Sequence, residues 1–208
     1  MVVIHHTAMT DAAAALARLC DPVSEVSAHY LIGADGRLWA LVDEEARAWH
    51  AGAGGWGGRG DVNSASIGIE LDNPGTAPFA APQMAVLEAL LADIMARRAI
   101  PATRVIGHAC MAPDRKDDPG PRFDWRRLAR AGLSVWPGPV MPARAPDWPA
   151  FRAAATAFGY PDAAPDKLLA AFRDRFRPRA TGPLDGLDLA LIRDLAARFP
   201  VDGTGRHP

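Results

Sequence analysis

Strand-like segments are the first feature in the pattern of apolar and polar positions. Five short segments are either apolar or alternate between apolar and polar residues, as is typical of β-strands: 2–5, 29–32, 37–42, 66–71 and 104–107. The turn at 34–36 contains Asp35-Gly36, a pair that tolerates the positive φ angles of tight turns. We therefore expect the second and third segments to form a hairpin.

Helical periodicity appears in two further segments of the same region. Residues 11–19 are rich in alanine, and residues 82–98 carry apolar side chains at helical spacing after an opening proline. With a short helix near Trp125, the order is β-α-β-β-β-α-β followed by a loop and a helix. This order predicts an α/β fold with a mixed central β-sheet flanked by helices. Residues 51–60 hold six glycines and one tryptophan, and we expect a surface loop there.

The composition changes at residue 135, which suggests a boundary. Five prolines between 135 and 149 indicate an ordered linker, and three amphipathic segments follow at 148–158, 166–176 and 186–199. The predicted organisation is a catalytic domain at 1–134, a proline-rich linker at 135–147 and a small helical bundle at 148–208. The basic residues around this last domain's second helix alternate with acids, so we expect a solvated helix face at Arg173, Arg175, Arg177 and Arg179.

Overall composition narrows the classes of partner. The 208 residues are 49% hydrophobic and 23% charged, with a net charge of -1, which gives no electrostatic case for nucleic-acid binding. No apolar run approaches the ~20 residues that span a bilayer. The start of the chain lacks the marks of a signal peptide, so we expect a cytoplasmic protein. We also expect a monomer. Because a predicted strand begins at the first residues, a periplasmic or envelope protein with a further N-terminal segment is the alternative.

Histidines follow two of the predicted strands. His5 and His6 come after an apolar run, and His108 follows the strand at 104–107. Asp118 lies ten residues beyond His108, in a charged segment between prolines. Two imidazoles and one carboxylate are a suitable ligand set for catalytic Zn²⁺, with the fourth position open for water. On spacing alone, structural histidines, an Asp118 that caps a turn, and Cys110 as a softer ligand remain open.

Glu70 and Lys116 are further candidates for chemistry. The period-two alternation of 66–71 places Ile67 and Ile69 on one face and Glu70 on the other, where a carboxylate needs a partner. Glu70 either faces solvent or an arginine, or acts as a base beside a metal-bound water. Lys116 lies two residues before Asp118 and could stabilise an oxyanion; a solvated lysine is the alternative.

Taken together, several segments of the first 130 residues resemble the amidase-2 family of N-acetylmuramoyl-L-alanine amidases. Each is weak by itself, but six in the family's order are specific: residues 3–8, 27–32, 48–52, 63–71, 107–108 and 112–121. The resemblance implies a zinc site of His5, His108 and Asp118, with His5 rather than His6 at the family position.

The same resemblance implies roles for other residues. Glu70 matches the family's catalytic glutamate and Lys116 its catalytic lysine. Arg115, Trp49 and His50 fall in segments that line the substrate cleft of relatives. The C-terminal helices are similar to a helical peptidoglycan-binding domain of some family members.

The implied activity is zinc-dependent hydrolysis of the amide bond between N-acetylmuramic acid, or its 1,6-anhydro form, and L-alanine. Substrates would be peptidoglycan or muropeptides released in cell-wall turnover and recycling. A non-catalytic peptidoglycan-recognition module is the alternative, and it is disfavoured because such relatives have lost a metal ligand. A helix-borne zinc peptidase is disfavoured because the chain has neither His-Glu-x-x-His nor its reverse.

Overall fold

The computed structural model describes residues 1–201 and contains a five-stranded sheet in the order β3-β2-β4-β1-β5. Its strands are β1 (Val2–His6), β2 (Tyr30–Ile32), β3 (Leu38–Ala40), β4 (Ile67–Leu71) and β5 (Val105–Gly107). The longer helices are α1 (Ala12–Cys20), α3 (Ala81–Arg98), α5 (Trp125–Arg130), α6 (Trp148–Phe158), α7 (Pro165–Phe176) and α8 (Gly186–Arg198). Shorter helical turns are η1 (Pro22–Ser24), α2 (Val62–Ala65), η2 (Ala102–Arg104) and α4 (His108–Met111).

The sheet is mixed, as the sequence predicted. Strands β2, β4, β1 and β5 run parallel to one another, while β3 pairs antiparallel with β2 through the predicted hairpin. Gly36 in that hairpin has a φ of 87°, which explains the glycine after Asp35. The parallel pairing places the carboxyl ends of β1, β4 and β5 at one edge of the sheet, the usual location of a binding crevice in α/β folds.

Helix α3 covers one face of the sheet. Alternate residues of the central strands point toward it, so Val2, Ile4 and Ile69 lie in one hydrophobic cluster with Leu87 and Leu91 of α3. The same cluster continues into α5 through Trp125 and Leu128. The remaining residues of β1 and β4 point to the opposite face, which leaves that face available for the site.

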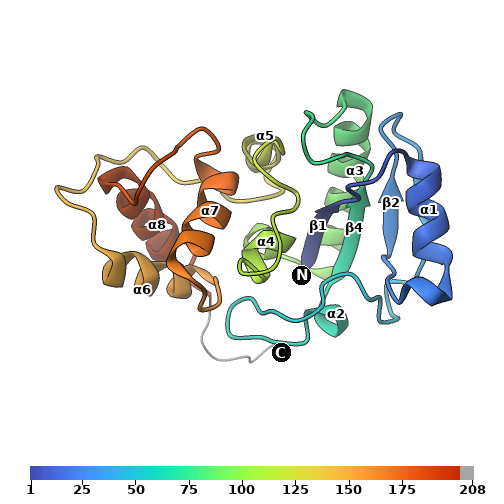
Figure 1. Cartoon of the computed structure of the whole chain (residues 1–208), viewed down its shortest axis with the longest axis horizontal. Coiled ribbons are helices and arrows are strands. Elements are labelled where there is room, and N and C mark those ends of the chain that lie inside the picture. The colour runs from blue at the N-terminus through green and yellow to red at the C-terminus, as the bar shows by residue number, and fades with distance from the viewer. Residues whose placement is uncertain (202–208) are drawn as a thin grey trace.

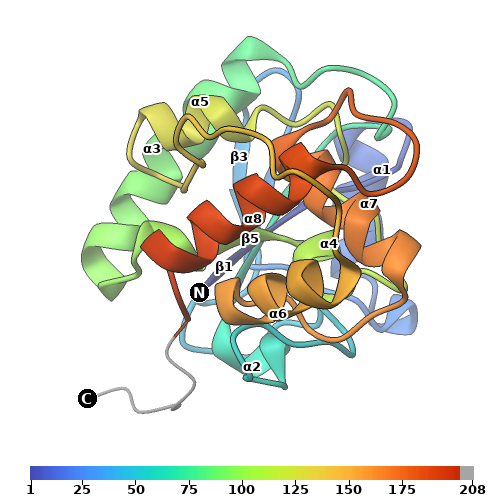
Figure 2. The same ribbon diagram turned by 90° about the vertical axis from the view of Figure 1, so that its left-hand side faces the viewer.

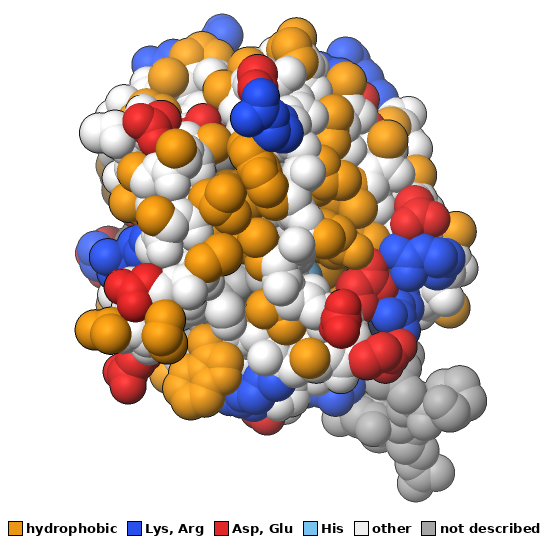
Figure 3. Space-filling model, turned by 90° about the vertical axis from the view of Figure 1, so that its right-hand side faces the viewer, with side chains coloured by type: hydrophobic (Ala, Val, Ile, Leu, Met, Phe, Trp, Pro, Cys, Tyr) orange, Lys and Arg blue, Asp and Glu red, His pale blue; other side chains and the backbone are white. Residues whose placement is uncertain are grey.

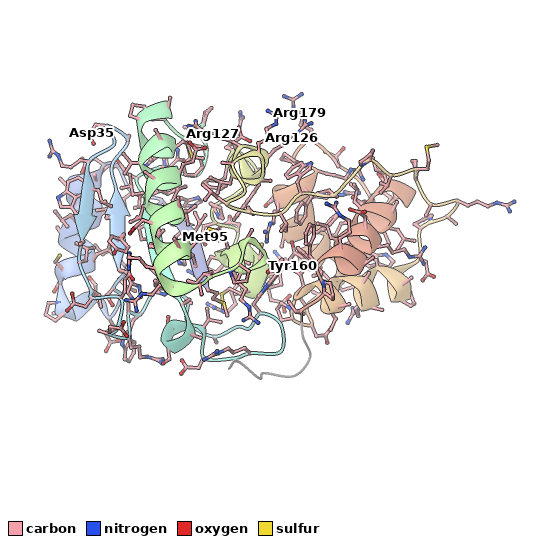
Figure 4. All side chains as sticks on the ribbon, turned by 180° about the vertical axis from the view of Figure 1, so that it is seen from behind. Asp35, Met95, Arg126, Arg127, Tyr160 and Arg179 are labelled. Carbon is pink, nitrogen blue, oxygen red and sulfur yellow. The ribbon has the colours of Figure 1, made fainter. Side chains whose placement is uncertain are left out.

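The C-terminal helices pack at one end of the molecule, with α4 and α5 between them and the sheet (Figure 1). From that end, α6, α7 and α8 are seen in front of the sheet (Figure 2). One hydrophobic cluster joins Val3 and Ile106 of the sheet to Phe151 and Phe172 of these helices. Tyr160 lies where α4 meets the C-terminal helices (Figure 4) and is 2% exposed. The helices therefore share a hydrophobic core with the sheet.

The predicted divisions at 134 and 147 stay a prediction, and residues 202–208 of the predicted last domain lie outside the described residues. The prediction of a solvated arginine face was wrong for two of its four members. Arg173 and Arg175 are 6% and 1% exposed. Arg173 forms an ion pair with Asp188, at 2.6 Å, and Arg175 stacks 4.6 Å from the centre of the Trp125 ring. Charge alternation cannot reveal such burial, because it does not show what packs against the helix.

The glycine-rich segment 51–60 is a loop, but its tryptophan is not on the surface. Trp56 is 1% exposed and packs edge-on against Phe158 and Tyr160. A Cβ at Gly159 would lie 2.6 Å from the indole, so this glycine makes room for the ring. Within the part of the chain that the structure describes, no helix is long and apolar enough to cross a membrane.

Candidate metal centre and active site

Three predicted ligands converge at the carboxyl edge of the sheet. His5 Nδ1 lies 3.0 Å from His108 Nδ1 and 2.9 Å from Asp118 Oδ2, and His108 Nδ1 lies 3.1 Å from the same carboxylate oxygen. All three residues are buried, with exposed fractions of 1%, 4% and 7%. The structure therefore brings together the set that the sequence predicted, while His6 turns toward the carbonyl of Pro119.

Local backbone structure explains this convergence. His5 stands near the end of β1 and His108 begins α4 directly after β5. The loop that carries Asp118 returns to the same edge, where the Asp118 carbonyl accepts a hydrogen bond from Ala109 N at 2.8 Å. A Cβ at Gly107 would lie 2.6 Å from Pro119 Cδ, so a glycine before His108 lets this loop approach the strand.

The protonation of these groups suits a cation. His108 Nε2 lies 2.8 Å from the carbonyl oxygen of Ala51, which can only accept, so this nitrogen carries the hydrogen and the neutral ring leaves the Nδ1 lone pair free. Burial, followed by the charge of His108, lowers the pKa of His5 to about 4.

The spacing of the three ligand atoms also fits a metal ion. Ligands bound at about 2.0–2.1 Å to a tetrahedral ion lie about 3.3–3.4 Å apart, slightly more than the separations observed here. A cation placed between a carboxylate and imidazole lone pairs would stabilise their convergence in a buried site. The three residues thus form a buried group that can hold a metal ion.

Glu70 lies on the strand next to that of His5. Glu70 and His5 are paired in the parallel register of β4 and β1, so their side chains share the face opposite α3. Among the described residues, the buried Oε2 atom of Glu70 has no hydrogen-bond partner. Burial raises the pKa of Glu70 well above its ordinary value, with the charge of Asp118 adding to this effect and that of Lys116 opposing it. Among residues 1–201 no arginine pairs with Glu70, which is half-buried at the wall of the cavity.

Lys116 and Arg115 lie at the mouth of the same cavity. Lys116 is exposed and forms no ion pair within residues 1–201. Arg115 donates hydrogen bonds to the carbonyl oxygens of Ala51 and Ala53 in the glycine-rich loop. The loop that carries Asp118 is thereby tied to the loop that contacts His108.

The predicted residues line one cavity of about 370 Å³. Trp49 is 57% exposed at its rim, and His50 is 9% exposed beneath it. On the face seen from the α1 end, hydrophobic side chains run across the middle and charged side chains gather along the margins (Figure 3). The cavity thus combines a buried metal-binding floor with a rim that offers both an indole ring and charged groups.

A family profile described as N-acetylmuramoyl-L-alanine amidase (Amidase_2) matches residues 1–121. The chain belongs to this family of amidases. The amidase is 37% identical to N-acetylmuramoyl-L-alanine amidase AmiD of Escherichia coli (strain K12), over 97% of its own chain and 84% of the relative. The predicted family and enzyme class are confirmed.

Two solved structures extend the comparison to the whole fold. A complex of Escherichia coli AmiD with the substrate anhydro-N-acetylmuramic acid-L-Ala-D-gamma-Glu-L-Lys matches with a TM-score of 0.90 and 36% identity, covering 97% of this amidase and 90% of that chain. AmpDh3 of Pseudomonas aeruginosa in complex with anhydromuramic pentapeptide matches with a TM-score of 0.83 and 32% identity, covering 96% and 92%. Both matches include the C-terminal helices, because residues 1–134 make up only about two thirds of the chain and could not give coverage of 96–97%.

Sequence reasoning missed residues that support the amidase site from behind. Asn63 is 8% exposed, and its Oδ1 accepts hydrogen bonds from the backbone N–H groups of His50 and Ala51. Ser66 lies beside the His50 ring, and Arg18 of α1 lines the cavity. No local pattern distinguishes these residues, because an asparagine, a serine and an arginine are ordinary on the surface.

Proposed function

We propose that His5, His108 and Asp118 bind Zn²⁺ and that this amidase cleaves the bond between the lactyl group of N-acetylmuramic acid and L-alanine. The observation that supports the metal is the triangle of ligand atoms, with all three residues buried and His108 held in the tautomer that frees Nδ1. When bound there, zinc would act as a Lewis acid toward the scissile carbonyl and lower the pKa of water to about 7.

The chain's own residues supply proton transfer and charge stabilisation. Glu70 shares the face of His5 and has a raised pKa, so its carboxyl group suits the exchange of a proton with the attacking water and then with the leaving L-alanine nitrogen. Lys116 lies in the same cavity, where its ammonium group can stabilise negative charge on the former carbonyl oxygen. Both roles agree with those that the family resemblance implied.

The substrate class follows from the cavity and the relatives. A cavity of about 370 Å³ is of the size that takes a small-molecule ligand or fragment. Both solved relatives were crystallised with anhydromuramic peptides. We therefore propose muropeptides, including 1,6-anhydro forms, as substrates, with Arg115 and Trp49 at the rim as substrate contacts. The compartment and the monomeric state stay predictions.

The deciding experiment identifies the bond that is cut. The protein is incubated with anhydro-N-acetylmuramoyl tripeptide and, separately, with intact sacculi, and products are identified by mass spectrometry. We expect free tripeptide and anhydro-N-acetylmuramic acid, faster release from the soluble fragment, and loss of release on chelation that added zinc reverses. Asp118→Asn, which preserves the shape of the side chain, is the matched control and should be inactive. Cleavage within the peptide would instead indicate a peptidase, and binding without cleavage would indicate a recognition module.

A further inference from the structure

His50 lies directly behind the proposed zinc ligand His5. Its Nδ1 atom is 3.0 Å from His5 Nε2, the ring nitrogen that points away from His108 and Asp118. The two rings meet edge to face, with centres 5.1 Å apart. His50 therefore contacts Nε2, the ring nitrogen of His5 that takes no part in the triangle of ligand atoms.

The direction of this hydrogen bond follows from the ligand role of His5. A neutral histidine that binds a metal through Nδ1 carries its hydrogen on Nε2. His5 Nε2 then donates to His50 Nδ1, which must hold a lone pair. The hydrogen of His50 is accordingly on Nε2, which faces Ser66 Oγ at 3.4 Å. Ser66 in turn donates its hydroxyl hydrogen to the carbonyl oxygen of Val62 at 2.5 Å, so each group in this series has an acceptor.

The neighbouring strand leaves space for the His50 ring. A Cβ at Gly68 would lie 2.5–2.6 Å from ring atoms Cδ2 and Nδ1 of His50, closer than side chains approach. A glycine in the middle of a central strand weakens the strand and often marks such a close approach. Gly68 thus has a specific explanation: it allows the imidazole to lie flat on β4, next to His5 on β1.

Backbone contacts hold the same segment in place. Asn63 Oδ1 accepts from the N–H groups of His50, at 3.1 Å, and Ala51, at 2.8 Å. The carbonyl of Ala51 is the group that accepts from His108 Nε2. His50 and Ala51 therefore contact the Nε2 atoms of the two proposed ligands, His5 and His108. One buried asparagine holds the backbone of both contacting residues in place.

We propose that His50 is a positioning residue for the metal centre, which accepts a hydrogen bond from His5 Nε2 and thereby fixes the tautomer and orientation of that ligand. This inference rests on the proposed zinc function and replaces the predicted substrate contact of His50, since the residue is 9% exposed and both ring nitrogens face groups of this chain. Groups that orient metal ligands in this way typically contribute about 10–100-fold to metal affinity.

A matched pair of variants tests the acceptor without changing the volume. Asparagine has its side-chain oxygen near the place of histidine Nδ1, whereas leucine has almost the same shape as asparagine but no acceptor. Zinc dissociation constants are measured by competition with a chromophoric chelator. We expect about 10–100-fold weaker binding for His50→Leu and binding within about threefold of the wild type for His50→Asn. The absorption spectrum of the cobalt-substituted protein should change in the leucine variant alone.

Equal zinc affinities of the two variants would overturn the positioning role. The wild type and His5→Ala test the zinc site separately from the role of His50. A wild type that binds no stoichiometric zinc, or a His5→Ala variant that binds it normally, would refute the zinc site itself.

A measurement on the unaltered protein remains informative if His50→Leu does not fold. Nitrogen-15 chemical shifts of the zinc-loaded wild type should show His50 protonated on Nε2, and protonation on Nδ1 would refute the proposal.

Discussion

Replacement of Trp56 by alanine should destabilise the whole protein although Trp56 lies in a glycine-rich loop. Its ring is 1% exposed and packs edge-on against Phe158 and Tyr160, at centre distances of 5.5 and 5.2 Å. Truncation of a buried tryptophan costs about 3–5 kcal/mol, which includes lost burial and the cavity that remains. The indole Nε1 has no partner among the described residues, and removal of such a buried donor returns about 1–3 kcal/mol. We therefore expect a loss of about 2 kcal/mol in the free energy of unfolding, below the usual range for a buried tryptophan.

Urea unfolding followed by circular dichroism measures this loss, and the corresponding fall in Tm is about 4–8 °C for a chain of this size. Trp49→Ala is the matched control, because Trp49 is 57% exposed and its removal should change stability by less than about 0.5 kcal/mol. We also expect Trp56→Ala to weaken zinc binding, since the loop it anchors carries the Ala51 carbonyl that holds His108. A loss of stability below about 1 kcal/mol would refute the shared core.

The other predictions concern the site and one surface ion pair. Asp118→Ala should abolish stoichiometric zinc binding, measured by elemental analysis, because two neutral imidazoles remain without the carboxylate; retained zinc would contradict the ligand assignment. Glu70→Gln should lower kcat by about 10²–10⁴-fold at unchanged zinc content, without loss of Tm, since the buried Oε2 atom of the glutamate has no partner in the described chain; an active variant would exclude the proton-transfer role. Glu44→Gln should cost about 1–2 kcal/mol at pH 7, because hydrogen bonds from Arg97 lower the pKa of Glu44 to about 2 and the exposure of that arginine reduces the effect. Since this pKa is depressed, the difference between Glu44→Gln and wild type should fade as pH falls from about 4.5 to about 2 in urea titrations; a constant difference would contradict the assignment.

Much of the sheet could be predicted because its signals are local. The alternation around Ile67 and Ile69 places Glu70 on the opposite face from the apolar residues, as the structure shows. The histidines at strand ends converge because parallel strands end at one edge, a rule that needs no knowledge of the partner segments. Even so, residue spacing alone left several ligand sets open, and the order of six short segments was needed to choose among them.

What could not be predicted depends on contacts between distant segments. The apolar face of α7 is visible in the sequence, but nothing local shows that Arg175 on this helix packs against Trp125 rather than facing water. His50 follows an exposed tryptophan in a polar stretch, and its burial against Gly68 arises only when the loop crosses β4. The four-residue helices α2 and α4 are too short to show any periodicity.

The hydrophobic cluster that joins the sheet to the C-terminal helices constrains how this protein can evolve. A self-contained module can be gained or lost by recombination with little change elsewhere. Here a lineage that lost the helices would expose Trp56, Ile106 and Ala109 at once. Such a loss would survive only with compensating polar substitutions in the catalytic half, so the two parts of the gene are expected to change together rather than be shuffled independently.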